Sequence, residues 1–378
     1  MRRLLLKLDG PLFFLMMILF ILGLIMIFSA STIESFMRYG TSPYYFFIKQ
    51  GIFLVAGFIA FLIIIRIPLK IYHDYIWYAV YAVVFMLFFL LAYGQAINDA
   101  YSWIRIGNLF SIQPSEFAKT IMILLMASFY HKNINRLDNY VIALTPPAIG
   151  LIMVAMTMFQ PDLGTALVLA LIVFNLFMVA PVAKTIKKDI IKIIIGGILV
   201  AIMVMIMSGR TILTSIHLER LNFLVPCSRF ETTGYHVCNG YIAINNGGLF
   251  GVGLGNSTQK YSYLPEAHTD FIFAIVLEEL GLLISLSIIC AFAVILWRIV
   301  KISRRSNNLM QSMIAYGVFL YILLHLVINL SGLLGLMPLT GIPLPFFSYG
   351  GSYLLNLFIA LALVQRIHIE NYNPNKIK

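Results

Sequence analysis

Ten long apolar runs constrain what this chain can fold into more than any other feature. A helix needs about 20 mostly apolar residues to cross the hydrocarbon core of a membrane. Only 11% of the residues are charged, against about 25% in soluble domains. The pattern predicts an all-α, polytopic integral membrane protein of about ten transmembrane helices, forming one domain over residues 1–378. The runs lie near 11–30, 46–65, 74–93, 115–130, 140–158, 163–180, 190–207, 270–297, 310–333 and 350–366.

The first run has two interpretations, because a basic start and Ser29-Ala30-Ser31 frame it like a signal peptide. Its apolar stretch from Pro11 to Phe28 has 18 residues, whereas the apolar core of a signal peptide has about 7–15. We therefore expect an uncleaved first span.

The basic residues predict the orientation. The net charge is +11, but the Lys and Arg residues form small separate clusters. A nucleic-acid groove needs a continuous basic stripe, so we expect no nucleic-acid partner. Ten spans place both termini on one side. With the N-terminus inside, 18 of the 26 Lys and Arg residues fall in cytoplasmic segments, and the positive-inside rule then predicts cytoplasmic N- and C-termini.

Two outer segments differ from ordinary connections. The loop at about 208–269, between the seventh and eighth runs, is far longer than a connection needs, and such loops are usually functional. The segment 334–349 has three prolines and no charge. It is too apolar for a wet loop, so we expect it to enter a protein-lined cavity.

Five glycines between positions 247 and 255 allow two interpretations. Tight turns at the membrane surface are the favoured one, because the permissive backbone of glycine suffices. The other is a set of backbone N–H groups that holds a lipid-linked pyrophosphate. Asn256 breaks a GxGxxG pattern, and no Gly-Lys-Ser/Thr follows, which argues against a nucleotide loop.

Asp270 is the candidate general base. It lies where the long loop ends and the eighth run begins, with Glu266 and His268 nearby. An acidic residue at a helix N-terminus is also simply stabilised by the helix dipole. A carboxylate at the edge of a low-dielectric cavity is, however, where a general base would be placed.

Glu278 and Glu279 lie eight and nine residues beyond Asp270. A charge inside a span is costly unless it is paired or lies in a water-filled cavity. Lys119, one turn into the fourth run, is the partner we expect for one of them. A structural ion pair and a catalytic cavity explain this pattern equally well.

Other polar residues have weaker signals. Trp103, beside Arg105 in a short outer loop, is typical of an interfacial anchor. His325 and Asn329 are predicted to make polar helix–helix contacts.

The three cysteines form no pattern of metal-ligand spacing. Cys227 and Cys238 are predicted to form a disulfide in the outer loop, because an outer face can be oxidising. Two free thiols are the alternative. Cys290 is expected to be buried in the middle of its span.

Several motifs together resemble the SEDS family of FtsW, RodA and SpoVE. The resemblance runs from about residue 9 to 368, and QPSEFAK and LPEAHTDFIFA are long and unusual. The motifs lie at Trp103–Gly107 (WIRIG), Gln113–Lys119 (QPSEFAK), Gln160–Gly164 (QPDLG), Asn246–Gly281 and Pro343–Ser352 (PLPFFSYGGS). FtsW is slightly favoured over RodA within the family. Ser102 departs from the family pattern, which commonly has Arg before this Trp.

The resemblance implies a peptidoglycan glycosyltransferase that polymerises lipid II by inverting transfer to an acceptor 4-hydroxyl. Its active site would face the outside of the bacterial cytoplasmic membrane. A class B penicillin-binding transpeptidase is the implied protein partner. A lipid II flippase and a non-catalytic scaffold of the division or elongation machinery are the alternatives.

The resemblance also implies roles for single residues. Asp270 matches the family's catalytic aspartate, and Glu116 and Lys119 match its cavity pair. Arg210 and Arg220, or a divalent cation such as Mg²⁺ or Mn²⁺, would stabilise the leaving pyrophosphate. The expected cavity residues further include Trp103, Arg105, Glu266, His268 and Ser348.

Overall fold

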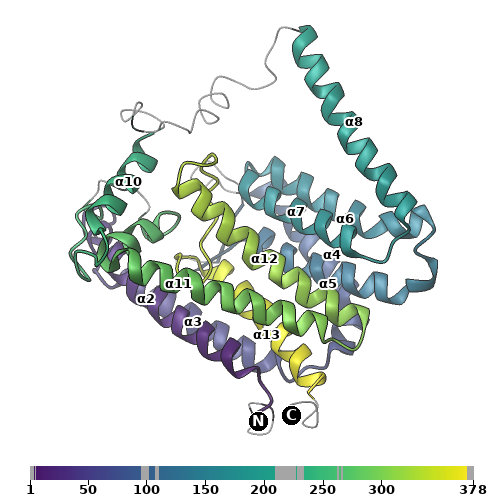
Figure 1. Ribbon diagram of the computed structural model, residues 1–378, viewed down its shortest axis with the longest axis horizontal. Coiled ribbons are helices and arrows are strands. Elements are labelled where there is room, and N and C mark those ends of the chain that lie inside the picture. Colours follow the sequence, from purple (N-terminus) through teal and green to yellow (C-terminus); the bar gives the residue numbers. More distant parts are fainter. Residues whose placement is uncertain are drawn as a thin grey trace.

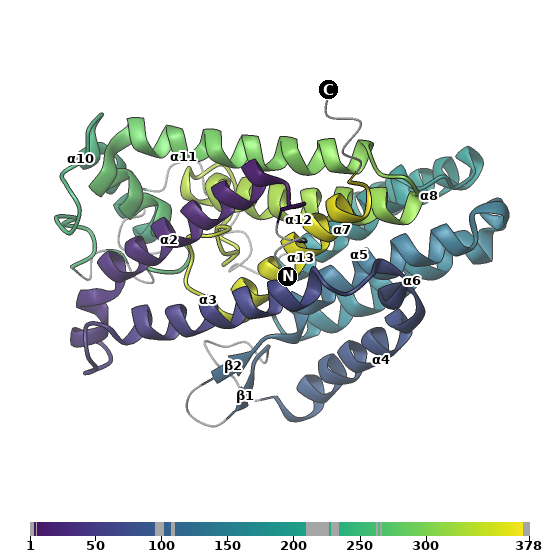
Figure 2. The same cartoon turned by 90° about the horizontal axis from the view of Figure 1, so that it is seen from below.

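The structure is a computed structural model that describes residues 4, 6–94, 102–106, 110–208, 227, 234–261, 264 and 267–372. It is an almost wholly helical bundle, with one short hairpin (Figures 1 and 2). The helices are α2 (Gly10–Met37), α3 (Tyr45–Ile64), α4 (Leu69–Tyr93), α5 (Pro114–Lys132), α6 (Tyr140–Phe159), α7 (Leu163–Val179), α8 (Lys184–Ser208), α10 (Tyr235–Gly247), α11 (Ile272–Arg304), α12 (Leu309–Leu333) and α13 (Gly351–Glu370), with a 3₁₀ turn at Ile134–Arg136.

Each of the ten apolar runs coincides with one of these helices, so the all-α membrane fold is confirmed. Within the described residues, seven helices are long and apolar enough to cross a membrane, and α7 is a shorter apolar helix. The seven are α2, α3, α4, α6, α11, α12 and α13. The remaining helix of the described residues, α10, matches no apolar run and lies inside the long loop.

Local sequence signals explain where the helices begin. Asp9 caps α2 by accepting a hydrogen bond from the Leu12 N–H. Asp162 caps α7 through the Thr165 N–H, and Pro114 occupies the first position of α5, where its missing N–H costs nothing. Gln113 donates a 2.7 Å hydrogen bond to Asp162, so the two similar QP motifs meet at one end of the bundle.

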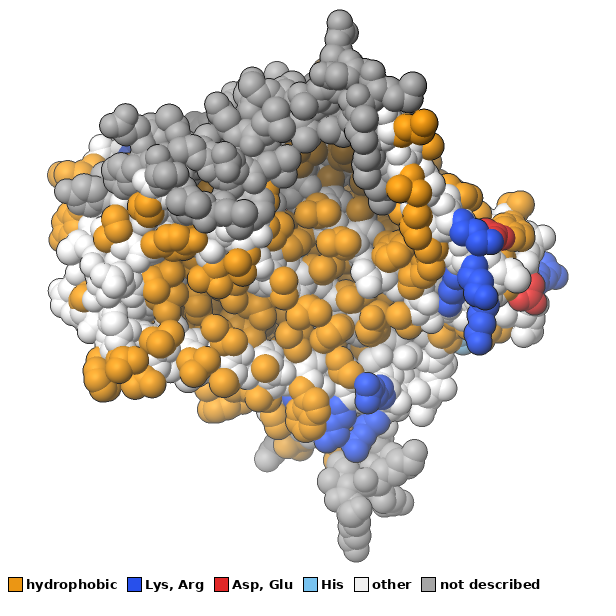
Figure 3. Space-filling view, turned by 45° about the horizontal axis from the view of Figure 1, so that its top comes forward, with side chains coloured by type: hydrophobic (Ala, Val, Ile, Leu, Met, Phe, Trp, Pro, Cys, Tyr) orange, Lys and Arg blue, Asp and Glu red, His pale blue; other side chains and the backbone are white. Residues whose placement is uncertain are grey.

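The polar centre of the bundle is formed by α5, α12 and α13. Of the most apolar 18-residue stretch of each helix, 78% is buried inside the bundle in α13, against 17% in α3 at the periphery. Both chain ends lie on the same side, and α8 stands out from the bundle (Figure 1). The described hydrophobic surface is broad, and basic side chains gather at its edges (Figure 3).

The hairpin joins β1 (Ile104–Ile106) to β2 (Phe110–Ile112) in antiparallel register, with Ile104 opposite Ile112. It is fastened to the start of α13, because the Ser352 hydroxyl accepts from the Gln113 N–H and donates to the Ser111 carbonyl.

Candidate active site

The apolar segment 334–349 returns into the bundle, as its composition predicts. Leu344 and Phe347 are fully buried, and the Phe346 ring packs against Phe20 of α2 at 4.8 Å. The approach to α2 is close, since a Cβ at Gly23 would lie 2.1 Å from the Phe346 carbonyl oxygen. This non-helical chain is enclosed by helices, which is the condition for irregular backbone at membrane depth.

Asp270 faces a small cavity between this segment and the end of the long loop. The cavity has a volume of about 130 Å³ and is lined by His236 of α10, Asn329 of α12 and Thr340, among others. Gly341 adopts φ +69°, and a Cβ there would lie 3.6 Å from the Asp270 Oδ2 atom. The Asp270 carboxylate therefore faces the backbone at Gly341, which has no side chain.

Asn329 fixes the backbone on both sides of this cavity. Its Nδ2 atom donates to the Asp270 carbonyl at 2.9 Å and to the Ile342 carbonyl at 2.8 Å. For Asn329, the predicted polar helix–helix contact is instead a contact between α12 and two irregular segments, whereas His325 makes the predicted kind of contact, with Lys119 of α5.

Ser348 has a similar backbone-fixing position. Its hydroxyl donates to the Thr269 carbonyl and accepts from the Leu344 N–H, both at 2.7 Å. These bonds hold the re-entrant segment against the residue next to Asp270.

His268, two residues before Asp270, is held by α2. Its imidazole is buried and its Nδ1 lies 3.0 Å from the Glu34 carboxylate of α2. It packs on Phe46 and Tyr349, and in the described part of the chain it is not among the residues that line the Asp270 cavity.

Lys119 pairs with Glu116, not with Glu278 or Glu279 as expected. Its Nζ lies 2.8 Å from Glu116 Oε1, and both side chains are almost fully buried. The same Nζ lies 3.0 Å from His325 Nε2. The other ring nitrogen of His325 lies 3.1 Å from the Pro343 carbonyl. The expectation failed because Glu116 is three residues away on the same helix, which places the two side chains on one face.

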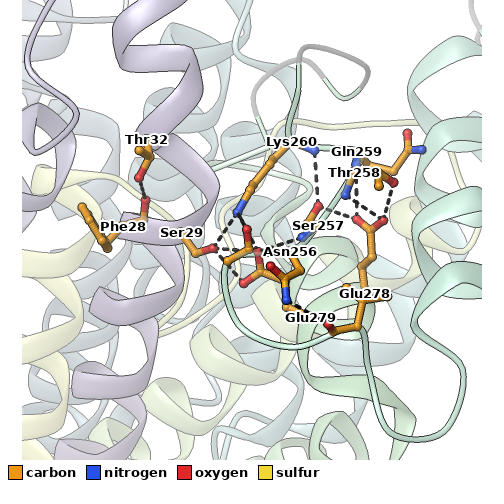
Figure 4. Close-up of polar contacts among 12 residues, drawn as sticks. Phe28, Ser29, Thr32, Asn256, Ser257, Thr258, Gln259, Lys260, Glu278 and Glu279 are labelled. Atoms are coloured by element: carbon orange, nitrogen blue, oxygen red, sulfur yellow. Dashed lines mark hydrogen bonds and ion pairs between the residues drawn. The ribbon is translucent and has the colours of Figure 1, made fainter.

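Glu278 and Glu279 are instead held by the long loop (Figure 4). Lys260 pairs with Glu279 at 3.1 Å, and Ser29 of α2 donates to the same carboxylate at 2.7 Å. Glu278 accepts from the hydroxyl and the N–H of Thr258 and from the hydroxyl of Ser257. Glu279 therefore forms an ion pair, but with Lys260 and not with the predicted Lys119.

The glycines form tight turns against α11. Backbone N–H groups of Val252 and Gly253 donate to the carbonyls of Glu278 and Glu279. Gly281 leaves the helical conformation with φ +78°, and a Cβ there would lie 2.3 Å from the Gly251 nitrogen. The N–H groups of Gly251, Val252 and Gly253 are thus used within the protein. The backbone N–H groups of residues 257–259 donate to two carboxylates of the chain itself, those of Glu278 and Glu279.

The remaining predicted site residues are only partly placed. Trp103 is half-buried directly before β1, and Arg105 lies in β1 opposite Ser111. Arg210, Arg220 and Glu266 lie outside the described residues.

His236 was missed by the sequence reasoning. One signal was available: His236 lies two residues before Cys238, whose predicted disulfide would hold that part of the loop in place. That cysteine forms a disulfide with Cys227, as predicted, with Cα atoms 5.0 Å apart. Cys290 is exposed on the surface of α11, and the expectation that it is buried was wrong.

No group of three His, Cys, Asp or Glu side chains that could hold a metal comes together within the described residues. Mg²⁺ commonly binds through one or two carboxylates together with substrate phosphates. Asp270 is the carboxylate of the described cavity that fits such a site, and a Mg²⁺ or Mn²⁺ requirement stays a proposal.

Comparison with known proteins decides the family. The family model described as "Cell cycle protein", of the FtsW, RodA and SpoVE group, matches residues 10–373. The chain belongs to this family. It is 35% identical to the "Probable peptidoglycan glycosyltransferase FtsW" of Bacillus subtilis, covering 100% of this chain and 95% of that protein.

Solved structures share the fold. One, described as "Structural coordination of polymerization and crosslinking by a peptidoglycan synthase complex", matches with a TM-score of 0.75 and 22% identity, covering 97% of this chain and 99% of the other. The Rod shape determining protein RodA of Thermus thermophilus matches with a TM-score of 0.67 and 23% identity, covering 97% and 98%. At these identities the likeness concerns the fold.

Proposed function

We propose that this protein is a peptidoglycan glycosyltransferase that polymerises lipid II, with Asp270 as its general base. One observation supports the base in particular. Asp270 lines a cavity at the junction of the long loop, the re-entrant segment and α12, in a chain that shares a family and 35% identity with proteins named peptidoglycan glycosyltransferase.

The reaction asks for few catalytic groups. Converting an α-linked pyrophosphate donor into a β-1,4-linked glycan inverts the anomeric carbon, so one direct displacement suffices. The acceptor 4-hydroxyl loses its proton to the base as the new bond forms, and the pyrophosphate leaves with the bonding electrons. Asp270 takes the proton, and cations neutralise the leaving group.

The buried Lys119 is not suited to neutralising the charge of the leaving pyrophosphate. It is fully buried and already bound to Glu116 and His325. The charge on the leaving group would be met by Arg210 and Arg220 of the long loop, or by a divalent cation. Lys119 acts as a positioning residue, because His325 connects it to the re-entrant segment at Pro343.

The proposed setting is a bacterial cytoplasmic membrane, with both termini in the cytoplasm and Asp270 on the outer face. Lipid II is the proposed substrate, and a class B penicillin-binding transpeptidase is the proposed protein partner. One protein of known structure that shares the fold belongs to a peptidoglycan synthase complex, which is the assembly such a partner would form.

The test is polymerisation of labelled lipid II by the purified full-length protein. Asp270→Asn keeps the side-chain size and removes the basic oxygen. General-base assistance is typically worth about 10²–10⁴-fold, so strand formation should fall at least a hundredfold while lipid II binding persists. Asp138→Asn, the same change at an exposed site between α5 and α6, should leave the rate unchanged.

Three results would overturn the proposal. If Asp270→Asn keeps more than about a tenth of the activity and His268→Gln abolishes it, the base is His268. If the wild-type protein makes no strands but moves lipid II across vesicle membranes, the protein is a transporter; if it does neither, a scaffold.

A further inference from the structure

A second pocket lies at the far end of α11 from Asp270, on the side of both chain ends. It has a volume of about 680 Å³, within the range of about 300–1,000 Å³ typical of ligand sites. Its charged lining comes from Asp9, Arg298, Lys301, Arg304 and Arg305. An adjoining hollow of about 350 Å³ shares the last three cations and adds Trp297.

The one carboxylate of the lining is already neutralised. Arg298 binds both oxygens of Asp9, one of them through Nε at 3.0 Å. Asp9 also caps α2, and its backbone exchanges hydrogen bonds with the Gln365 side chain of α13. This pair therefore joins α2, α11 and α13 and takes no part in recognising a ligand.

Lys301, Arg304 and Arg305 have no carboxylate partner within 4 Å among the described residues. Three cations around one hollow repel each other, and an anion relieves that repulsion. The nearby Glu370 does not supply it, since it binds Arg366 and Gln311.

The walls of the pocket are held in place. Asn371 donates to Gln311 at 2.9 Å and accepts from the Asn307 N–H at 3.2 Å. These bonds join the end of α13 to the connection between α11 and α12. The hollow is thus set by the packing of the helices and does not depend on long surface side chains alone.

Trp297 places the pocket at the membrane boundary. Its side chain is 57% exposed, and the Lys301 ammonium lies 4.9 Å from its ring. Exposed tryptophans next to the first cations of a span are typical of the headgroup level. Figure 3 shows a group of basic side chains at the lower edge of the hydrophobic face.

The other large basic group, at the start of α8, is arranged differently. Lys187 donates to the carbonyls of Met178 and Ala180, and Lys192 lies 3.8 Å from Asp189. Those cations act on the protein itself. The two groups therefore differ: Lys187 and Lys192 of α8 are bound by the protein itself, whereas Lys301, Arg304 and Arg305 line a hollow.

We propose that Lys301, Arg304 and Arg305 bind the phosphate headgroup of an anionic phospholipid, with Trp297 packing on its glycerol and upper acyl region. Basic pockets between transmembrane helices are known to suit such headgroups. The lipid would connect the ends of α11 and α13 at the membrane surface. This site is separate from the Asp270 cavity and does not depend on the glycosyltransferase proposal.

The test uses the full-length protein in neutral detergent micelles, titrated with phosphatidylglycerol or with phosphatidylcholine. The melting temperature reports binding, because a ligand of the native state raises it. We expect phosphatidylglycerol to raise it at lower concentration than phosphatidylcholine. In Lys301→Gln/Arg304→Gln/Arg305→Gln, the phosphatidylglycerol midpoint should rise at least tenfold, since each cation near a charged surface contributes about fivefold.

The matched control is Lys184→Gln/Lys188→Gln/Lys192→Gln, which removes the same charge on the same side and should shift the midpoint less than twofold. If the triple site variant does not fold, Arg305→Gln alone should shift it about fivefold. The proposal fails if site and control variants titrate alike. It also fails if inorganic phosphate alone produces the saturable shift that the site variant loses, because the ligand is then soluble.

Discussion

Lys119 shows how strongly one buried charge depends on its partner. Its side chain is 1% exposed and that of Glu116 is 2% exposed, so removing one partner leaves the other uncompensated. Breaking such a pair typically costs about 3–5 kcal/mol. We expect Lys119→Met to lower the free energy of unfolding by an amount of that order, measured by thermal unfolding in detergent.

The double variant Lys119→Met/Glu116→Gln should recover part of the loss, because it removes both charges together. Strict additivity of the two single changes would rule out the coupling. Lys192→Met is the matched control. Its side chain is 77% exposed, and exposed substitutions usually stay within about 0.5 kcal/mol.

At single positions, the sequence predicts which residues are polar and buried better than it predicts their partners. The i, i+3 spacing of Glu116 and Lys119 was visible, but the distant Glu278 and Glu279 were preferred on depth alone. His268 is 234 residues from its partner Glu34. No local pattern encodes such a contact, because it depends on how α2 packs against the loop.

Among the helices, α11 departs most from expectation. Its apolar run predicts one continuous span, but Gly281 interrupts it with φ +78°, and the glycines of the long loop pack into the break. Glu278 and Glu279 therefore lie before the break, where loop residues satisfy them. Predicting the break requires the long loop and α11 to be considered together, whereas hydrophobic periodicity is analysed one segment at a time.

Gly281→Ala tests this interpretation of α11. An added Cβ would meet the Gly251 nitrogen at 2.3 Å, and backbone strain of this kind costs about 1–3 kcal/mol. We expect a lower melting temperature and reduced strand formation, because the long loop that leads to Asp270 loses its packing against α11. Gly196→Ala in α8 is the control, since nothing lies within 4 Å of its added Cβ. Equal effects of the two changes would contradict a special role for the break.

For the whole molecule, hydropathy predicted most of the fold. All ten apolar runs fall on helices, with ends differing by up to seven residues, because hydropathy marks lipid contact and helices continue beyond it. The composition of segment 334–349 also predicted its return into the bundle. The assembly of His236, Asn329 and Thr340 around Asp270 was not predictable, since it joins four parts of the chain.

The orientation is the prediction that concerns the molecule as a whole. With 18 of 26 Lys and Arg residues on the side of both termini, the positive-inside rule places that side in the cytoplasm. The Asp270 cavity is then outside and the basic pocket inside. Single cysteines introduced at exposed positions, in a Cys290→Ala background that keeps the native disulfide, should report this arrangement through a membrane-impermeant thiol reagent.

Ser42→Cys and Phe250→Cys, at the Asp270 end, should react in intact cells. Thr185→Cys and Asn307→Cys, at the other end, should react only after the membrane is permeabilised. All four positions are exposed, so a failure to react reflects the membrane and not burial. The reverse pattern would place Asp270 in the cytoplasm. Strands made there would lie inside the cell, so that result would also contradict the proposed outer-face polymerase.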